Sequence, residues 1–341
     1  MSDYEPVDEV PRRTRLGILA AILLILVGLP AGFLIWATSV PGQSFAGPLP
    51  PVTPERQVLA NRLRADVVAI ASEPHNLNHM AALVRSEAYI VGQLRAASYE
   101  IQTQDVLLPA RNLEVVVEPK VASAPTLVVG AHYDSIMGAP GANDNGSGSA
   151  ALLELARRLK RHDGQLGRRV RIIFFVNEEP PYFKSNAMGS RVAALALGKS
   201  HEQVEGMISL ETMGYFDDRP GTQHYPFPLG LRYPDTANFI AFVGDLDSRP
   251  FVRRSIAQFR RHAQIPSVGG TAPTFVQGID WSDHWSFSQE GIPAFMVTDT
   301  APFRYPHYHE ATDTPDKVNY ERLALVVEGL EGMILDLAGT R

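Results

Sequence analysis

The sequence predicts an α/β fold in which a mainly parallel, mixed central sheet carries helices on both faces, preceded by one N-terminal transmembrane helix. Short apolar runs rich in β-branched residues, of which 126–131 is one, alternate with segments such as 151–159, where apolar residues recur at helical spacing. This alternation is typical of strand–helix–strand units built on a parallel sheet. Ahead of them, Leu16–Ala37 contains no charged residue and is long enough to cross the hydrocarbon core of a bilayer.

The apolar N-terminal segment is interpreted as an uncleaved membrane anchor. Arg12, Arg13 and Arg15 precede it, and no comparable basic group follows it. The positive-inside rule therefore predicts a cytoplasmic N-terminus and a periplasmic or extracellular domain. The alternative is a cleaved signal peptide with a small-residue site at 44–46, although the apolar part of such peptides usually has only about 7–15 residues.

Composition divides the chain into four parts. Residues 1–15 form a cytoplasmic tail, 16–37 the transmembrane helix, 38–54 a proline-rich linker and 55–341 the folded domain. The linker has several prolines and neither a helical nor a strand period, so an extended spacer is expected there.

The overall composition narrows the possible functions. A hydrophobic content of 45% is enough for a sizeable core and excludes a disordered chain. With a net charge of -6 and no basic cluster outside the N-terminus, no nucleic-acid partner is expected. Because the sequence has no cysteine, any metal ion must be held by His, Asp and Glu.

The domain is expected to contain seven strands and five helices. The strands are predicted at 99–107, 113–118, 126–131, 169–176, 204–210, 237–243 and 293–298, and the helices at 56–72, 80–97, 151–159, 250–261 and 318–337. The first two strands are expected to be neighbours at one side of the sheet.

Metal-binding residue types follow three of these strands. His132 and Asp134 come after the strand at 126–131, Glu178 and Glu179 after the next, and Glu211 after the one at 204–210. Asp144 stands just before the helix at 151–159. Because parallel strands end at one edge of the sheet, where α/β folds bind their ligands, these side chains are expected to converge.

Carboxylates packed together repel one another unless cations neutralise them. Two divalent ions and a bridging hydroxide would balance the three charges of Asp144, Glu179 and Glu211. Histidine and carboxylate ligands without sulfur suit zinc in a catalytic rather than a structural site.

A proline-flanked loop near the C-terminus offers two more histidines, His307 and His309. If its backbone is extended, both imidazoles point the same way, and the pattern does not choose between them. Asp313 could accept the second ring N–H of His309, and Asp134 that of His132, since metal-bound histidines usually have such a partner.

The motifs GAHYDS, GANDNGSG, FVNEEP, SLETMGY, SDHWSFSQEGIPA and YHEATDTPDKV together resemble the two-zinc aminopeptidase family of metallopeptidases, of the membrane-anchored bacterial type. Glutaminyl cyclases are related to this family. The resemblance covers about Arg56–Leu337. It implies two zinc ions, with His132 and Glu211 on one, Glu179 and His309 on the other, and Asp144 bridging both.

The resemblance also implies a mechanism. Glu178 would be the general base for a zinc-activated hydroxide that attacks the scissile carbonyl. A free substrate α-amine on one zinc would restrict cleavage to the first residue of a peptide. The peptide bond after Asp144 is expected to be cis, as is common in the family.

This chain departs from the family pattern at several positions. Many relatives have Asp where Glu211 stands, and Ile279 occupies the place of a tyrosine that some relatives use against the oxyanion. The substrate pocket is predicted to include Tyr215, Phe216 and Arg304, which lie close in sequence to the ligands.

Several other residues are given structural rather than functional roles. His75 and His79 are expected to be exposed in a loop, and His284 to lie near a helix start that Ser282 caps. The side chains of Trp281, Trp285 and Phe287 are expected in the core.

The predicted function is therefore zinc-dependent removal of residues from peptide or protein N-termini by a membrane-bound metallopeptidase. One alternative is a glutaminyl-peptide cyclotransferase with a single zinc. The other is a binding ectodomain that has the same fold without the chemistry.

Overall fold

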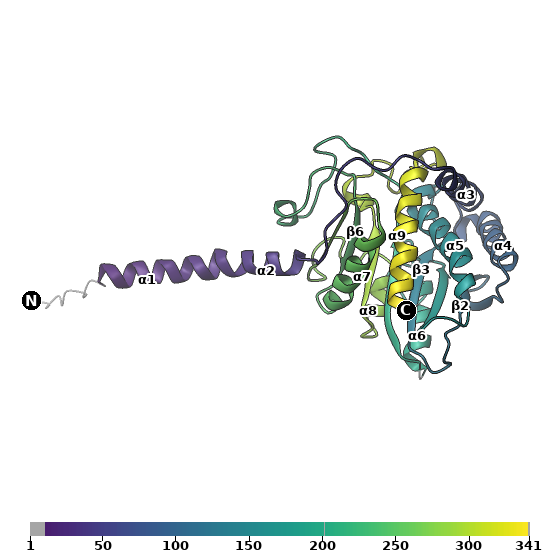
Figure 1. Ribbon diagram of the computed structural model, residues 1–341, viewed down its shortest axis with the longest axis horizontal. Helices are drawn as coiled ribbons and strands as arrows, with labels where there is room; N and C mark the ends of the chain where they lie inside the picture. Colours follow the sequence, from purple (N-terminus) through teal and green to yellow (C-terminus); the bar gives the residue numbers. More distant parts are fainter. Residues whose placement is uncertain (1–10, 201, 340–341) are drawn as a thin grey trace, which may run out of the picture.

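A computed structural model describes residues 11–200 and 202–339, so most of the predicted cytoplasmic tail, residues 1–10, lies outside the described part. Within the described ranges, one helix, Arg12–Thr38, is long and apolar enough to cross a membrane, although a signal sequence would have the same character. It consists of α1 (Arg12–Leu23), the π-helical turn η1 (Leu24–Gly28) and α2 (Leu29–Thr38), and it projects from the folded domain (Figure 1). Pro30 lacks an N–H and would clash with the preceding turn of a regular helix, and the wider turn of η1 accommodates it.

The domain is built on one sheet with the strand order β1-β2-β4-β3-β5-β8-β6-β7. The strands are β1 (Gln102–Leu107), β2 (Ala110–Val117), β3 (Thr126–His132), β4 (Arg169–Phe175), β5 (Val204–Glu211), β6 (Ile240–Gly244), β7 (Ser267–Thr271) and β8 (Ala294–Thr298). Strands β4, β3, β5 and β8 are parallel, whereas β2 and β6 run antiparallel to their neighbours in this central group. The mixed sheet is confirmed, as is the pairing of the first two strands at one edge.

Helices cover both faces of this sheet, as predicted. On one face lie α3 (Pro54–Ile70), α4 (Met80–Ala96), α5 (Gly148–Leu159), α7 (Arg249–His262) and α9 (Tyr320–Ala338), and on the other α6 (Gly189–Lys199) and the short α8 (His284–Ser288). The larger hydrophobic core lies under the first group, and a smaller core that includes Val128, Phe175 and Phe287 lies under the second. The helix α9 runs across the front of the domain in Figure 1.

The sequence sets the ends of the long helices. At the start of α3, Thr53 accepts a hydrogen bond from the N–H of Arg56 (3.2 Å), and Pro54 stands at the first helical position, where its missing N–H costs nothing. At the start of α9, Asn319 accepts from the N–H of Arg322 (3.0 Å), and the helix ends at Gly339, whose φ of +73° favours glycine.

The strand β7 and the helix α6 were not predicted. The sequence of β7, SVGGT, has two central glycines, and glycine weakens any strand pattern. The glycines are required by packing, because a Cβ on Gly269 would lie 2.7 Å from the Ile256 side chain and one on Gly270 would meet the hydroxyl of Tyr233.

The proline-rich segment after the membrane helix lies against the domain rather than free of it. Arg260 of α7 donates to the carbonyls of Pro41 (3.0 Å) and Gly42 (2.8 Å), and the Ser44 hydroxyl accepts from the N–H of Ser267 in β7 (2.8 Å). The segment then crosses the top of the domain to reach α3 (Figure 1). Its irregular backbone agrees with the prediction, but it is a packed strap and not a spacer.

Candidate metal centre

The site lies where three adjacent strands of the sheet end. His132 is the last residue of β3 and Glu211 the last of β5, the strand beside it. On the other side of β3, β4 leads into Asn177, whose left-handed φ of 59° turns the chain so that Glu178 and Glu179 follow at the same edge. The prediction that these side chains would meet rested on the parallel order of these strands.

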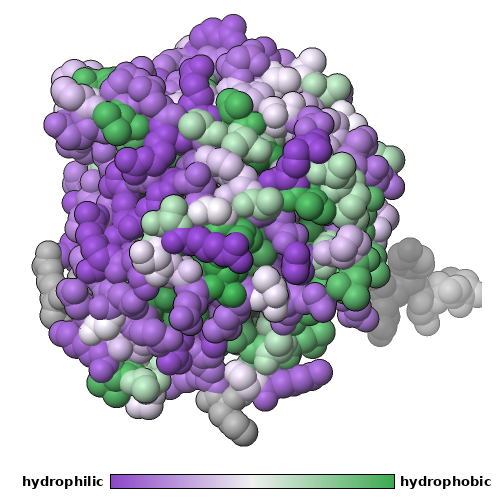
Figure 2. All heavy atoms as spheres, turned by 90° about the vertical axis from the view of Figure 1, so that its right-hand side faces the viewer, coloured by the Kyte–Doolittle hydropathy of each residue, from purple (hydrophilic) through white to green (hydrophobic). Residues whose placement is uncertain are grey.

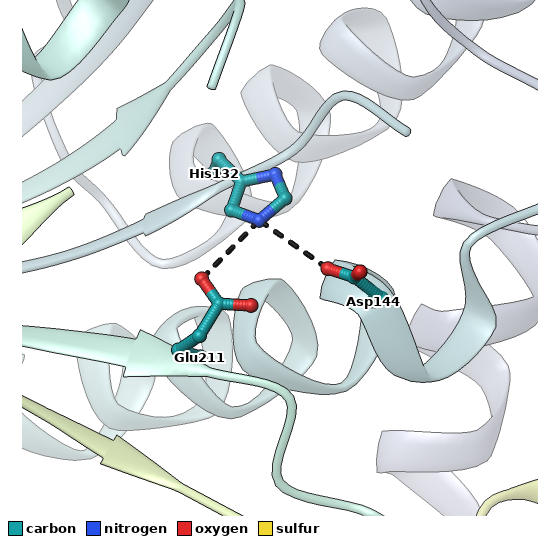
Figure 3. A group of neighbouring side chains, drawn as sticks. All are labelled: His132, Asp144 and Glu211. Carbon is teal, nitrogen blue, oxygen red and sulfur yellow. Dashed lines mark ion pairs between the residues drawn. The ribbon is translucent and has the colours of Figure 1, made fainter. Parts of the chain in front are cut away.

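His132, Asp144 and Glu211 form the first group (Figure 3). The Nε2 atom of His132 lies 3.5 Å from Oδ1 of Asp144 and 3.3 Å from Oε2 of Glu211. All three side chains are buried. Each points one ligand atom toward the others, and these atoms all lie within 4.8 Å of one another.

Asp144 also belongs to a second group, with Glu179 and His309. The Nε2 atom of His309 lies 3.1 Å from Oδ2 of Asp144 and 3.4 Å from Oε2 of Glu179. The two groups therefore use different oxygens of one carboxylate. The Asp144–Asn145 peptide bond is cis, as the resemblance implied.

Burial and crowding shift the protonation of the whole cluster. Burial, with neighbouring carboxylates, raises the pKa values of Glu178 and Glu179 well above the usual range. Burial opposes a charge on His132, but Glu211 and Glu178 raise its pKa well above the ordinary value. Without another cation, protons would have to supply the positive charge that these carboxylates attract.

The donor set fits zinc. His132 Nε2 and Glu179 Oε1 are buried atoms without a hydrogen-bond partner among the described residues, and unpaired buried polar atoms are costly unless a ligand completes them. Imidazole nitrogens and carboxylate oxygens, three around each of two centres with Asp144 common to both, are typical of catalytic zinc sites with an open position.

Both carboxylates expected to orient the histidines accept backbone N–H groups, and that of Asp134 also forms an ion pair with His132. The Nδ1 atom of His132 lies 3.1 Å from the backbone carbonyl oxygen of Asp134 and 3.6 Å from its carboxylate. That carboxylate accepts the N–H groups of Glu178 (3.2 Å) and Glu179 (3.4 Å). Asp134 thus fixes the turn that carries both glutamates.

Asp313 does not serve His309, so that prediction is wrong. Its carboxylate accepts the N–H groups of Asn143 (2.9 Å) and Asp144 (3.1 Å) and the hydroxyl of Tyr305 (2.6 Å). The backbone at His309 has a φ of +60°, so the extended loop on which a common direction of the His307 and His309 rings depended does not exist. Asp313 instead fixes the backbone of Asp144, the residue whose carboxylate is common to both ligand groups.

Two residues of the site were missed in the sequence. The hydroxyl of Ser282 donates to Oε2 of Glu211 (2.8 Å) and is therefore not the helix cap that was expected. Asp283 is completely buried near His132, and burial raises its pKa to about 7. Both stand at the start of α8, and only the packing of that short helix brings them under the cluster.

An apolar pocket adjoins the cluster. Glu211 and Tyr308 are among its polar lining residues, and Phe239, Ile279, Trp281, Met296 and Phe303 are among its apolar ones. Trp281 is exposed rather than in the core, so its predicted role was wrong, whereas Phe287 is buried as predicted.

None of the three predicted pocket residues lines this pocket. The guanidinium of Arg304 is buried and donates to three backbone carbonyls, among them that of Phe239 at 3.0 Å. The ring of Tyr215 packs 4.9 Å from that of Tyr305, and Phe216 packs against the main core. These three residues therefore pack inside the domain near the ligands and do not form the wall of the pocket.

Two histidines outside the cluster are also buried. His75 was expected to be exposed, but it is buried beside the site. Its backbone N–H donates a hydrogen bond to the hydroxyl of Ser135 (3.0 Å). His79 is exposed, as predicted. His284 begins α8 and lies 2.8 Å from the carbonyl oxygen of Ile279 through Nε2, which agrees with a structural role.

Comparison with known families places this geometry in context. Peptidase family M28 matches residues 112–331 of the chain. An uncharacterized protein of Escherichia coli K12, YfbL, is 38% identical over 269 residues, which cover 75% of this chain and 81% of that protein. Leucine aminopeptidase 1 of Arthroderma otae is 28% identical over 228 residues, 63% of this chain, and the chain spans only 55% of it.

Solved structures share the fold. The Legionella pneumophila LapA aminopeptidase superimposes with a TM-score of 0.64 at 17% identity, over 86% of this chain and 78% of its own. The zinc aminopeptidase BSAP of Bacillus subtilis superimposes with a TM-score of 0.52 at 23% sequence identity, over 67% of this chain and 50% of its own. A glutaminyl cyclase from an Acidobacteriales bacterium superimposes with a TM-score of 0.59 at 18% sequence identity, over 87% of this chain and 99% of its own.

Proposed function

The chain belongs to peptidase family M28, and from this membership we propose that it is a zinc-dependent aminopeptidase that removes residues from the N-termini of peptides. The predicted metallopeptidase family is confirmed, and zinc is the metal that this family implies. The observation that carries the finer proposal is the pair of ligand groups that share Asp144.

We assign His132 and Glu211 to one zinc ion and Glu179 and His309 to the other, with Asp144 between them. The short distances within each group and the unpaired His132 Nε2 support this assignment. Bound zinc ions supply Lewis acidity, which polarises a carbonyl and lowers the pKa of a water molecule toward neutrality.

Glu178 is assigned as the general base. Its Oε2 lies 3.8 Å from His132 Nε2, but it belongs to neither ligand group, so its carboxylate is free to hold a proton. It would take a proton from the attacking water onto a carboxylate oxygen and then pass that proton to the leaving amine nitrogen.

The pocket beside Glu211 would receive the first side chain of the peptide. Its walls are mostly apolar and aromatic, and such surfaces bind apolar groups by excluding water. Free peptide and protein N-termini are the proposed substrates. No nucleic-acid partner is proposed, in keeping with the net charge of -6.

The full chain, purified in detergent, tests this proposal directly. Metal analysis should find close to two zinc ions per chain, and aminoacyl-nitroanilides should be hydrolysed until a chelator is added. A chain that has no zinc and no chelator-sensitive activity would contradict the proposal and favour a binding ectodomain.

A glutaminyl cyclase is the second candidate, because a cyclase shares the fold over 99% of its own length. A peptide with N-terminal glutamine separates the two activities. The peptidase would release free glutamine, and the cyclase would release ammonia and leave pyroglutamate on the peptide. Ammonia release with a single bound zinc would replace the aminopeptidase proposal.

Asp134→Asn is expected to lower kcat/KM by about 10–100-fold, the usual loss when a group that supports metal ligands is changed. The amide has only one oxygen to accept the two N–H groups of Glu178 and Glu179. Activity and zinc affinity would be measured beside Asp105→Asn, an exposed residue of the edge strand β1. Equal activity of the two variants would show that the turn is held by other contacts.

The N-terminal helix is proposed to anchor the enzyme. Residues 1–15 would be cytoplasmic, 16–37 would cross the membrane, and 38–54 and 55–341 would lie outside. The apolar length of Arg12–Thr38 and the three arginines at its start support this topology.

A further inference from the structure

The end of the membrane helix is fixed to the domain at several points. The Arg249 guanidinium lies 4.1 Å from the centre of the Trp36 ring and donates to the Trp36 carbonyl (2.7 Å). The Thr271 hydroxyl of β7 donates to the carbonyl of Ala37 (3.3 Å). Ala37 and Thr38 are buried against the domain, whereas the helix before them is almost entirely exposed.

If the N-terminal helix is the proposed anchor, these contacts set the distance between the domain and the bilayer. The apolar stretch ends at Ala37, where the helix meets β7, so no spacer separates the domain from the membrane surface. Trp36 is 46% exposed at this level, and tryptophan and arginine are typical of the boundary between membrane and water. With the helix as the proposed anchor, the edge of the domain around β7 would therefore lie next to lipid headgroups.

Two loops at this edge expose large apolar side chains. In the segment 225–233, Phe227 is 88% exposed and Leu231 is 73% exposed, and the neighbouring Arg232 donates to the hydroxyl of Thr38 (3.3 Å). Just after β7, Phe275 is 87% exposed. The green loop that carries the turn η5 (Leu229–Leu231) projects on the side from which the membrane helix leaves (Figure 1).

Both loops also border the apolar pocket. Pro226 and Leu229 come from the first loop, and Ala272 and Gln277 from the second. The opposite side of the domain is mostly hydrophilic, with hydrophobic residues in small groups (Figure 2). The apolar loops are thus close both to the helix end and to the pocket.

We propose that Phe227, Leu231 and Phe275 lie in the interfacial layer of the bilayer that the N-terminal helix crosses, so that the apolar pocket opens at the membrane surface. This inference rests on the proposed anchor. Lipid is favoured over another protein as the occupant because the loops continue the surface formed by the helix end. The exposed Arg232 lies there beside Thr38, and arginine near a membrane surface attracts anionic headgroups.

The absence of cysteine from the sequence makes a direct test possible. Single cysteines would be placed in the full chain by Phe227→Cys and Phe275→Cys, labelled with an environment-sensitive fluorophore and reconstituted in phosphatidylcholine–phosphatidylglycerol vesicles. Leu108→Cys is the matched control, since Leu108 is an apolar residue that is 74% exposed at the far edge of the sheet, between β1 and β2. Leu26→Cys, within the helix, reports on the anchor.

Spin-labelled lipid should reduce the emission at positions 227 and 275 at least about twofold more than at 108, and aqueous iodide should do the reverse. Quenching by lipid at 26 but not at 227 and 275 would overturn the interfacial proposal alone. Shielding of 227 and 275 from both quenchers would point to a second copy or a partner protein, and would also overturn it.

The anchor and the interface fail in distinguishable ways. If lipid does not quench the label at 26, the anchor proposal fails and the interfacial proposal fails with it, while the peptidase assay remains unaffected. Phe227 and Phe275 do not line the pocket, so unchanged nitroanilide hydrolysis would show that each labelled chain is folded. Positions in two separate loops keep the test decisive if one substitution prevents folding.

Discussion

Glu178→Gln is expected to lower kcat by about 10²–10⁴-fold, the usual contribution of a general base, while the zinc content stays unchanged. Glutamine has the same shape as glutamate but cannot take a proton from the attacking water. Because Glu178 lies outside both ligand groups, its change removes proton transfer and leaves the metal ligands in place. Steady-state kinetics and metal analysis on the same preparation measure both quantities.

The adjacent residue provides the matched control. Glu179→Gln makes the same chemical change one position further along, but at a residue of the second ligand group. It is expected to lose zinc together with activity. If Glu178→Gln loses zinc to the same extent, Glu178 is a ligand and another group must act as the base.

The strand-end residues could be predicted because their positions follow from a local pattern and one topological rule. His132 and Glu211 directly follow apolar runs, and the central strands are parallel, so adjacency at one edge follows. The strand β7 could not be predicted in this way. Its glycines are explained by close contacts with residues outside the strand, among them the side chains of Ile256 and Tyr233.

The supporting residues were the least predictable part of the site. Asp313 is close to His309 in sequence, but the left-handed backbone at His309 is not visible in the sequence, and the carboxylate binds the backbone of Asp144 instead. Ser282 reaches Glu211 only because α8 packs beneath β5. Long-range packing decides such contacts, so a carboxylate or hydroxyl in the right motif predicts a supporting role without predicting its partner.

Asp144→Asn is expected to have an effect on activity at least as large as that of Glu178→Gln, and for a different reason. The carboxylate places one oxygen 3.5 Å from His132 and the other 3.1 Å from His309. An amide keeps the shape but replaces one of these oxygens with an NH₂ group, which cannot bind a metal, and it removes one negative charge. The zinc content should fall to one ion or fewer per chain.

Unfolding measured with and without a chelator shows whether Asp144→Asn loses activity because it binds less zinc or because it is less stably folded. A chelator should destabilise the wild-type chain by about 4 kcal/mol for each zinc ion that it removes, if free zinc was about a thousandfold above the Kd of each site, and it should change Asp144→Asn less because that variant binds fewer ions. Without metal, the variant should be less stable than the wild type, because burial is outweighed by hydrogen bonds to His132 and His309, which hold the pKa of Asp144 below its usual range and so favour its charged form. Thermal unfolding in detergent, with Asp105→Asn as the charge-matched exposed control, measures this difference. Two tightly bound zinc ions in Asp144→Asn would contradict the shared-carboxylate assignment, since no other described residue belongs to both ligand groups.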